Sequence, residues 1–230
     1  MKTKRNEQLQ RTAIGEYPFT PSTYPGRRPR FSFLFTRRGI HRLKLRNLDR
    51  LLARRGLASV NERYAILTYG SNACPGQLLS KKLDDVPVLY GRLIGAQAVY
   101  ARRETQRGYV PATLARAHGG RSSWVTLLTA EQLERMDESE GRPGNYYVLA
   151  ELPKVRFSVG SVHFTPLYTY VEMSGGVMTI DGQPMKLRSN GQKRAKLLLQ
   201  NAIAEPAANW LDYEIIPHPN SPTKYSQIVR

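Results

Sequence analysis

A short polar loop separates an apolar run from a helix-like pattern in YAILTYGSNACPGQLLSKK, residues 64–82. Gly70 lets another group approach the backbone closely, and Pro75 suits the first position of a helix, where its missing N–H group is not needed. A strand, a polar loop and a helix start can together leave several backbone N–H groups free to bind an anion. The pattern therefore predicts a carboxylate or phosphate site, although an ordinary strand-to-helix turn fits it equally well.

A second set of residues with chemical potential lies in LTAEQLERMDESEGRPGNYY, residues 128–147. Thr129 and Gln132 form a capping-box pattern, and Gly141 is expected to end the helix that they begin. Glu140 then lies at the helix C-terminus, where the macrodipole disfavours a negative charge and so favours proton uptake by a general base. The alternative interpretation is a solvated acidic helix face without catalytic function.

In combination, YGSN and MDESEGRPGNYY resemble the gamma-glutamylcyclotransferase family, including its AIG2-like relatives. GRLIGAQAVY, YVPATLARAHGG, PLYTYVE and GQKRAKLLLQNAIAE are similar to later segments of that family, so the resemblance covers about residues 61–205. It implies an α+β fold: a small mixed, mainly antiparallel β-barrel-like domain with flanking helices. It also implies that Glu140 is the catalytic acid/base. The substrate-binding residues that it implies are Leu67, Thr68, Tyr69, Gly70, Ser71, Asn72 and Tyr146.

The implied reaction converts a γ-glutamyl amine or amino acid to 5-oxoproline and a free amine, with no metal or cofactor. Glu140 would take a proton from the α-ammonium, and the amine would attack the γ-carbonyl of the same molecule. Tyr147 is the alternative pocket tyrosine if the register is off by one residue. Ser71 as an acyl nucleophile is a rival mechanism that lacks a GxSxG setting and an evident histidine partner. Lys193, where the family often has tyrosine, leaves the substrate identity open.

Cysteine and histidine spacing argues against a metal site. Cys74 is the single cysteine, so an intrachain disulfide and a four-cysteine zinc site are excluded, and an incidental role is expected for it. The four histidines show no HxxxH or HExxH spacing. No segment approaches the ~20 apolar residues of a membrane span, and the N-terminus lacks the apolar core of a secretory signal. A cytoplasmic protein without a transmembrane segment is therefore expected.

Positive charge is concentrated near the N-terminus. The net charge is +17, and residues 1–60 hold 15 Lys and Arg against three acidic residues, a net charge of +12. Residues 1–35 look irregular because of their prolines, whereas 37–56 predict an amphipathic basic helix. We therefore expect a basic arm over 1–60, a gamma-glutamylcyclotransferase-like domain over 61–215 and an extended tail over 216–230.

Two roles are open for this arm and its helix. The helix could dock on the domain with a solvated basic face, or it could contact nucleic acid or another polyanion. In either case the arm is expected to serve location or partnership rather than chemistry. The alternative to an enzyme is a non-catalytic binding module of the same fold, whose arm contacts nucleic acid or an acidic partner. RNA binding through the aromatic residues and arginines of 17–38 is a weaker possibility.

The remaining elements follow from periodicity and turn signals. Strands are expected over 64–70, 88–103, 109–116, 124–129, 148–158 and 162–173, with a glycine-containing turn around 119–120. Helices are expected over 75–83, 130–138 and 191–203.

Overall fold

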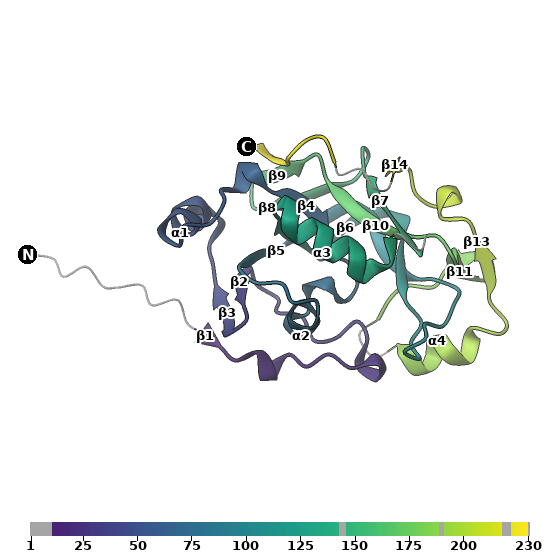
Figure 1. Ribbon diagram of the computed structural model, residues 1–230. Helices are drawn as coiled ribbons and strands as arrows, with labels where there is room; N and C mark the ends of the chain where they lie inside the picture. Colours follow the sequence, from purple (N-terminus) through teal and green to yellow (C-terminus); the bar gives the residue numbers. More distant parts are fainter. Residues whose placement is uncertain (1–10, 143–145, 189–190, 218–221, 230) are drawn as a thin grey trace, which may run out of the picture.

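The computed structural model describes residues 11–142, 146–188, 191–217 and 222–229. It shows a mixed α+β fold built around one large, mostly antiparallel sheet (Figure 1). The strand order of this sheet is β1-β3-β2-β5-β6-β4-β10-β7-β14, with β8, β9 and β15 attached beside β5. Because the order begins at β1 and ends at β14, the sheet is open, and the expected barrel-like closure is wrong.

The strands of the large sheet are β1 (Arg11–Thr12), β2 (Phe33–Thr36), β3 (Gly39–Arg42), β4 (Tyr64–Leu67), β5 (Val86–Tyr100), β6 (Ala112–Leu128), β7 (Tyr147–Glu151), β8 (Arg156–Val159), β9 (Val162–Thr165), β10 (Tyr168–Glu172), β14 (Glu214–Ile216) and β15 (Gln227–Val229). A smaller sheet contains β11 (Val177–Ile180), β12 (Gln183–Pro184) and β13 (Ile203–Glu205). The α-helices are α1 (Leu48–Arg54), α2 (Pro75–Ser80), α3 (Ala130–Glu140) and α4 (Gln192–Leu198).

Two long strands, β5 and β6, form the centre of the sheet and pair antiparallel from Val88↔Thr126 to Tyr100↔Ala112. The turn expected around 119–120 is wrong, because β6 continues through it. The register shifts there, between Ile94↔Gly120 and Gly95↔Ala117, and Gly119 has a φ of +79°. A glycine at positive φ lets the strand bulge and bend without ending.

Strand β4 lies inside the sheet, between β6 and β10, and all four of its side chains are buried. This continuous apolar run is typical of a strand covered on both faces. One face packs against α3, whose Leu133 and Met136 share a hydrophobic cluster with Ile66 of β4. The chain leaves β4 at Leu67 and enters the YGSN loop, so the sheet and α3 together fix where that loop begins.

The helix expected over 37–56 is wrong except for its last turns. The chain instead forms the β2–β3 hairpin, then a 3-10 turn, then α1. Phe33 and Phe35 are fully buried, and β2 pairs with β5. Their aromatic side chains suit a strand, and burial against the sheet outweighs the charges that follow them. The sheet thus crosses the expected boundary at residue 60. At the other end, β15 pairs with β9, so the tail is extended where it is described.

Among the residues that the structure describes, no helix is long and apolar enough to cross a membrane.

Candidate active site

A cavity of about 610 Å³ opens where the YGSN loop, the end of α3 and the loop after β5 meet. Its wall includes the residue predicted as catalytic, Glu140, and every residue predicted to bind substrate: Leu67, Thr68, Tyr69, Gly70, Ser71, Asn72 and Tyr146. The structure therefore brings together two segments that lie about 70 residues apart in the sequence, as Asn72 and Glu140 show with a separation of 68. Their roles in chemistry stay a prediction.

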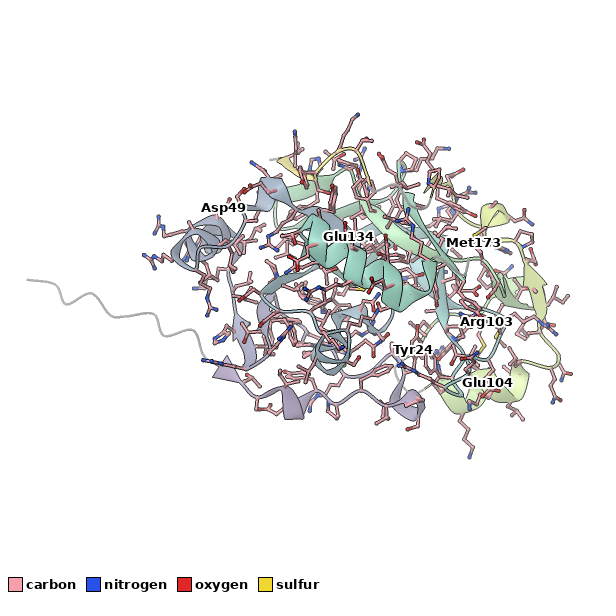
Figure 2. All side chains as sticks on the ribbon, viewed as in Figure 1. Tyr24, Asp49, Arg103, Glu104, Glu134 and Met173 are labelled. Atoms are coloured by element: carbon pink, nitrogen blue, oxygen red, sulfur yellow. The ribbon has the colours of Figure 1, made fainter. Side chains whose placement is uncertain are left out.

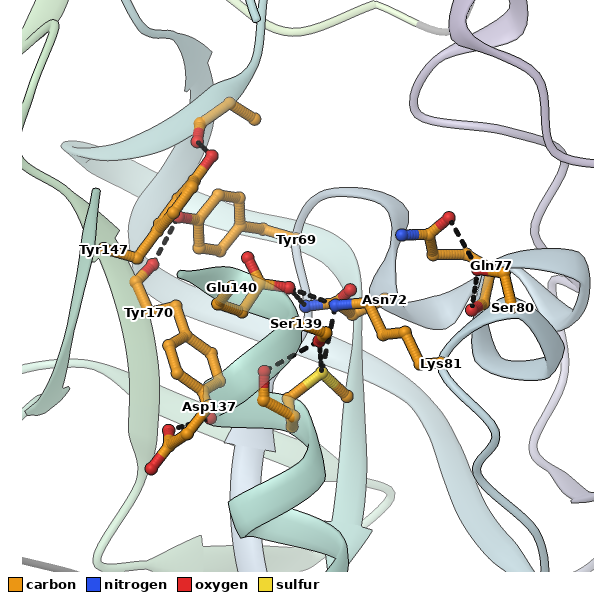
Figure 3. Close-up of polar contacts among 12 residues, drawn as sticks. Tyr69, Asn72, Gln77, Ser80, Lys81, Asp137, Ser139, Glu140, Tyr147 and Tyr170 are labelled. Carbon is orange, nitrogen blue, oxygen red and sulfur yellow. Dashed lines mark hydrogen bonds and ion pairs between the residues drawn. The ribbon is translucent and has the colours of Figure 1, made fainter. Parts of the chain in front are cut away.

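Glu140 is the last residue of α3 and faces the YGSN loop. Thr129 caps the start of the helix by accepting from the Gln132 amide, and Gly141 ends it in the left-handed conformation with a φ of +65°. The Oε1 atom of Glu140 accepts a hydrogen bond from Asn72 Nδ2 at 2.9 Å and pairs with Lys81 Nζ (Figure 3). No described residue is a partner of Oε2. One carboxylate oxygen is thus held by two donors, and the other remains available to a ligand.

Lys81 is a site residue that sequence reasoning missed. It follows α2 directly, and its side chain is only 4% exposed, against 14% for Glu140. Its Nζ also contacts Met136 Sδ at 3.2 Å, so the ammonium lies between α2 and α3. In the sequence Lys81 is followed by Lys82, and nothing in that pair distinguishes the buried lysine from the exposed one.

The loop leaves polar groups free beside Glu140. Ser71 and Asn72 begin a 3-10 helix, Ser71–Ala73, and the amide N–H groups at the start of such a turn have no partner within it. Within the described ranges, Asn72 Oδ1 and the buried Thr68 Oγ1 also have no hydrogen-bond partner. Buried polar groups normally have partners, so these atoms are suited to a polar ligand.

Gly70 is required here by close contact rather than by an unusual backbone angle. Its φ is −94°, which other residues can adopt. A Cβ atom at this position would lie 2.9 Å from the hydroxyl oxygen of Tyr24. Glycine therefore allows the loop to pack directly against Tyr24.

The deep wall of the cavity is formed by three tyrosines: Tyr69 and Tyr170, which are buried, and Tyr147, which is partly buried. Tyr147 Oη donates to the Ala112 carbonyl at 3.3 Å, Tyr170 Oη donates to Asp137 Oδ1 at 2.5 Å, and Tyr69 Oη donates to the Tyr170 carbonyl. Burial raises the pKa of Tyr69, Tyr147 and Tyr170 well above the usual value. All three phenols are therefore protonated donors at neutral pH.

Tyr146 and Tyr147 occupy different parts of the cavity. Tyr146 is 47% exposed and lies at the rim, with the Arg103 guanidinium 5.4 Å from its ring centre. Tyr147 is in the deep wall. Arg103 pairs with the fully buried Glu172 at 2.5 Å, so its charge at the rim is balanced.

The N-terminal segment also contributes to the site, contrary to the expectation that it serves only location or partnership. Tyr24 is 4% exposed, lines the cavity and accepts a hydrogen bond from the Ala112 amide at 2.9 Å. Its ring stacks on Tyr109 with 4.6 Å between centroids. Figure 2 shows Tyr24 with Arg103 and Glu104, which line the same cavity. Nothing in the proline-rich sequence around Tyr24 indicates that its side chain lines the cavity.

Nucleophilic catalysis finds little support in the described part of this cavity. No histidine is among its lining residues, so Ser71 has no imidazole base there. Cys74 is fully buried outside the cavity lining, and its sulfur contacts the Tyr17 carbonyl at 3.6 Å. Burial raises the pKa of the Cys74 thiol, which makes it a poor nucleophile at neutral pH.

Comparison with known proteins gives a limited result. No protein-family model and no curated protein sequence matches this chain. A solved structure named "Gamma-glutamyl cyclotransferase" is similar, with 18% identity, 49% of this chain and 68% of that chain covered, and a TM-score of 0.40. A Homo sapiens structure described as uncharacterized protein loc79017 is similar with 19% identity, the same coverage and a TM-score of 0.38.

Proposed function

We propose that this protein is a gamma-glutamylcyclotransferase-like enzyme that converts a γ-glutamyl amine or amino acid to 5-oxoproline and a free amine. The observation that carries the proposal is the Glu140 carboxylate, which borders the cavity beside the YGSN loop and whose Oε2 has no partner among the described residues. A non-catalytic module of the same fold would not require a largely buried carboxylate with one oxygen held and the other open. The geometry therefore supports catalysis over that alternative.

In the proposed reaction, the backbone of the YGSN loop binds the α-carboxylate of the substrate. Glu140 Oε2 takes a proton from the α-ammonium, and the freed amine attacks the γ-carbonyl of the same molecule. A C–N bond closes the five-membered ring and the γ-amide C–N bond breaks. The departing amine takes two protons, the one on Glu140 and the one that the ring nitrogen loses as it becomes an amide, and leaves as an ammonium. Because nucleophile and electrophile share one molecule, the site needs only to select the cyclising conformer and supply the acid/base.

Lys81 and Asn72 share one task in this scheme. Both donate to Oε1 of Glu140, so they orient the carboxylate and leave Oε2 for the proton transfer. The protonated tyrosines of the deep wall supply a fixed polar surface next to it. Arg103 and Arg107 line the same cavity.

The test is a panel of γ-glutamyl compounds that differ in the departing group: simple amines, amino acids and peptide-bound amines. Purified protein should release 5-oxoproline and an equimolar amount of amine from at least one class. Absence of 5-oxoproline across the panel, from folded protein, would contradict the proposal.

A second candidate function concerns a polyanionic partner, and one observation favours it. Arg46, Arg50 and Arg54 follow one another at intervals of four residues, so they share one face of the helical segment that includes α1. All three are exposed, and none forms an ion pair with another residue of the described ranges. The label of Asp49 marks this helix in Figure 2. The opposite face of α1 buries Leu48 and Leu52, so the basic face is held outward.

We propose nucleic acid as the partner of this basic face. Replacing all three arginines by glutamine should weaken binding of a labelled RNA and flatten its dependence on salt, because fewer counterions are released. Lys193, an exposed cation on α4, provides the control substitution to glutamine. Equal affinity and equal salt slope for the triple variant would rule out this surface.

A further inference from the structure

Arg28 contacts the YGSN loop from outside the cavity. Its Nη1 atom donates to the Tyr69 carbonyl at 2.8 Å and to the Gly70 carbonyl at 3.1 Å. Arg28 is not among the residues that line the cavity, whereas Tyr69, Gly70 and Ser71 are. The guanidinium therefore holds two consecutive peptide groups and is not itself part of the cavity wall.

These two hydrogen bonds determine where the amide hydrogens of the loop point. In a planar trans peptide, the C=O group and the N–H group of the next residue point in opposite directions. The Tyr69 carbonyl shares its peptide with the Gly70 amide, and the Gly70 carbonyl shares its peptide with the Ser71 amide. Because both carbonyls turn toward Arg28, both N–H groups turn away from it, and their residues Gly70 and Ser71 both line the cavity. Successive N–H groups with a common direction form an anion-binding concavity.

Arg28 is itself firmly held. Its guanidinium lies 4.4 Å from the centre of the Trp124 ring, and the Trp124 Nε1 group donates to the Pro29 carbonyl at 2.7 Å. Burial lowers the pKa of Arg28 to about 10, which still leaves it charged at neutral pH. A charged, stacked guanidinium is a strong and well-oriented donor to two carbonyl oxygens.

A separate observation indicates that a polar ligand belongs beside this backbone. Thr68 immediately precedes the loop, is 2% exposed and lines the cavity. Its hydroxyl oxygen has no hydrogen-bond partner in the described part of the chain. A hydroxyl beside two parallel amides is a suitable third donor for a carboxylate.

We propose that Arg28 is a positioning residue that presets the Gly70 and Ser71 amides, together with the Thr68 hydroxyl, to bind a ligand carboxylate. The N-terminal segment is thereby part of the ligand site and not only an appendage to it. Identifying this carboxylate as the α-carboxylate of a γ-glutamyl compound rests on the proposed function. The proposal that these groups bind a carboxylate does not rest on the proposed function, because binding requires no turnover.

The experiment compares two probes by calorimetry: 5-oxoproline and its carboxamide, which lacks only the negative charge. The wild-type protein should bind 5-oxoproline at least tenfold more tightly than the carboxamide. Arg28→Met should remove most of that preference, while affinity for the carboxamide changes less than twofold. Arg28→Lys, which keeps a charged donor, should retain part of the preference.

The control variant is Arg30→Met, which replaces an exposed arginine of the same segment and should behave as wild type. Thermal unfolding checks that each variant is folded, and Arg28→Lys keeps the test available if Arg28→Met does not fold. An equal loss of affinity for both probes would mean a merely structural role and would overturn the proposal. So would wild-type discrimination in Arg28→Met, or a lack of discrimination in the wild-type protein. Missing turnover with intact carboxylate discrimination would instead reject the cyclotransferase.

Discussion

Replacing Lys81 by methionine should both destabilise the protein and disturb the proposed base. Lys81 is 4% exposed along its side chain and Glu140 14%, so the substitution leaves a carboxylate in a largely buried position. Removing one member of a buried ion pair costs about 3–5 kcal/mol. Glu140 keeps its hydrogen bond from Asn72 and borders the cavity, so we expect a loss near the lower limit, about 3 kcal/mol.

In thermal unfolding, this loss corresponds to a fall in Tm of about 6–12 °C for a chain of this length. Urea unfolding gives the free energy directly. The double variant Lys81→Met/Glu140→Gln also removes the carboxylate charge that Lys81→Met leaves without its ammonium partner. Its free energy of unfolding should therefore fall by only about 1 kcal/mol. The double variant should thus be about 2 kcal/mol more stable than Lys81→Met. Lys82→Met is the matched control. Lys82 is exposed, so this variant should keep nearly the wild-type free energy of unfolding.

The account of the ion pair fails if Lys81→Met is as stable as Lys82→Met. It also fails if the double variant is no more stable than Lys81→Met, because the carboxylate charge left without Lys81 would then cost nothing.

Other substitutions test neighbouring parts of the site. Gly70→Val should abolish binding of 5-oxoproline in calorimetry, because its Cβ would lie 2.9 Å from the Tyr24 hydroxyl; normal affinity would contradict the proposed packing of the loop. Cys74→Ala should keep full turnover, and at pH 8 the native thiol should react with iodoacetamide far more slowly than the urea-unfolded thiol, since burial raises its pKa. Deleting residues 1–10 should leave turnover intact, whereas deleting residues 1–36 should abolish it, because the second deletion removes Tyr24 and strand β2; equal turnover of both truncations would show that the N-terminal segment is dispensable for the site.

Local patterns were sufficient for the parts of the fold that carry the predicted site. The apolar run of β4 and the capping box at Thr129 act within a few residues, so they indicate their elements directly. The end of α3 at Gly141 is confirmed, and with it the place of Glu140 on the helix. Two such local segments, joined by a resemblance to a family, were enough to nominate the residues that the cavity brings together.

Features that depend on tertiary contact could not be predicted in this way. Strand β3 falls in the predicted basic helix because charge and leucine spacing dominate residues 37–56, and most of β2 falls in the segment expected to be irregular. The pairing of β2 with β5 depends on residues far away in the sequence. Lys81 and Glu140 are 59 residues apart, and Arg28 and Tyr69 are 41 apart. Neither pairing has a local signature. The long range of these contacts also explains why the N-terminal segment was predicted to be an arm instead of part of the site.

The most direct test of the central claim is formation of 5-oxoproline by the wild-type protein and by Glu140→Gln, on the best γ-glutamyl compound of the panel. Glutamine keeps the size of the side chain but cannot accept the proton, so turnover should fall about 10²–10⁴-fold, or about 3–5 kcal/mol of barrier, while the fold is retained. Thermal unfolding of the same samples checks the fold. Near wild-type 5-oxoproline formation by folded Glu140→Gln would contradict the assignment of Glu140 as the acid/base.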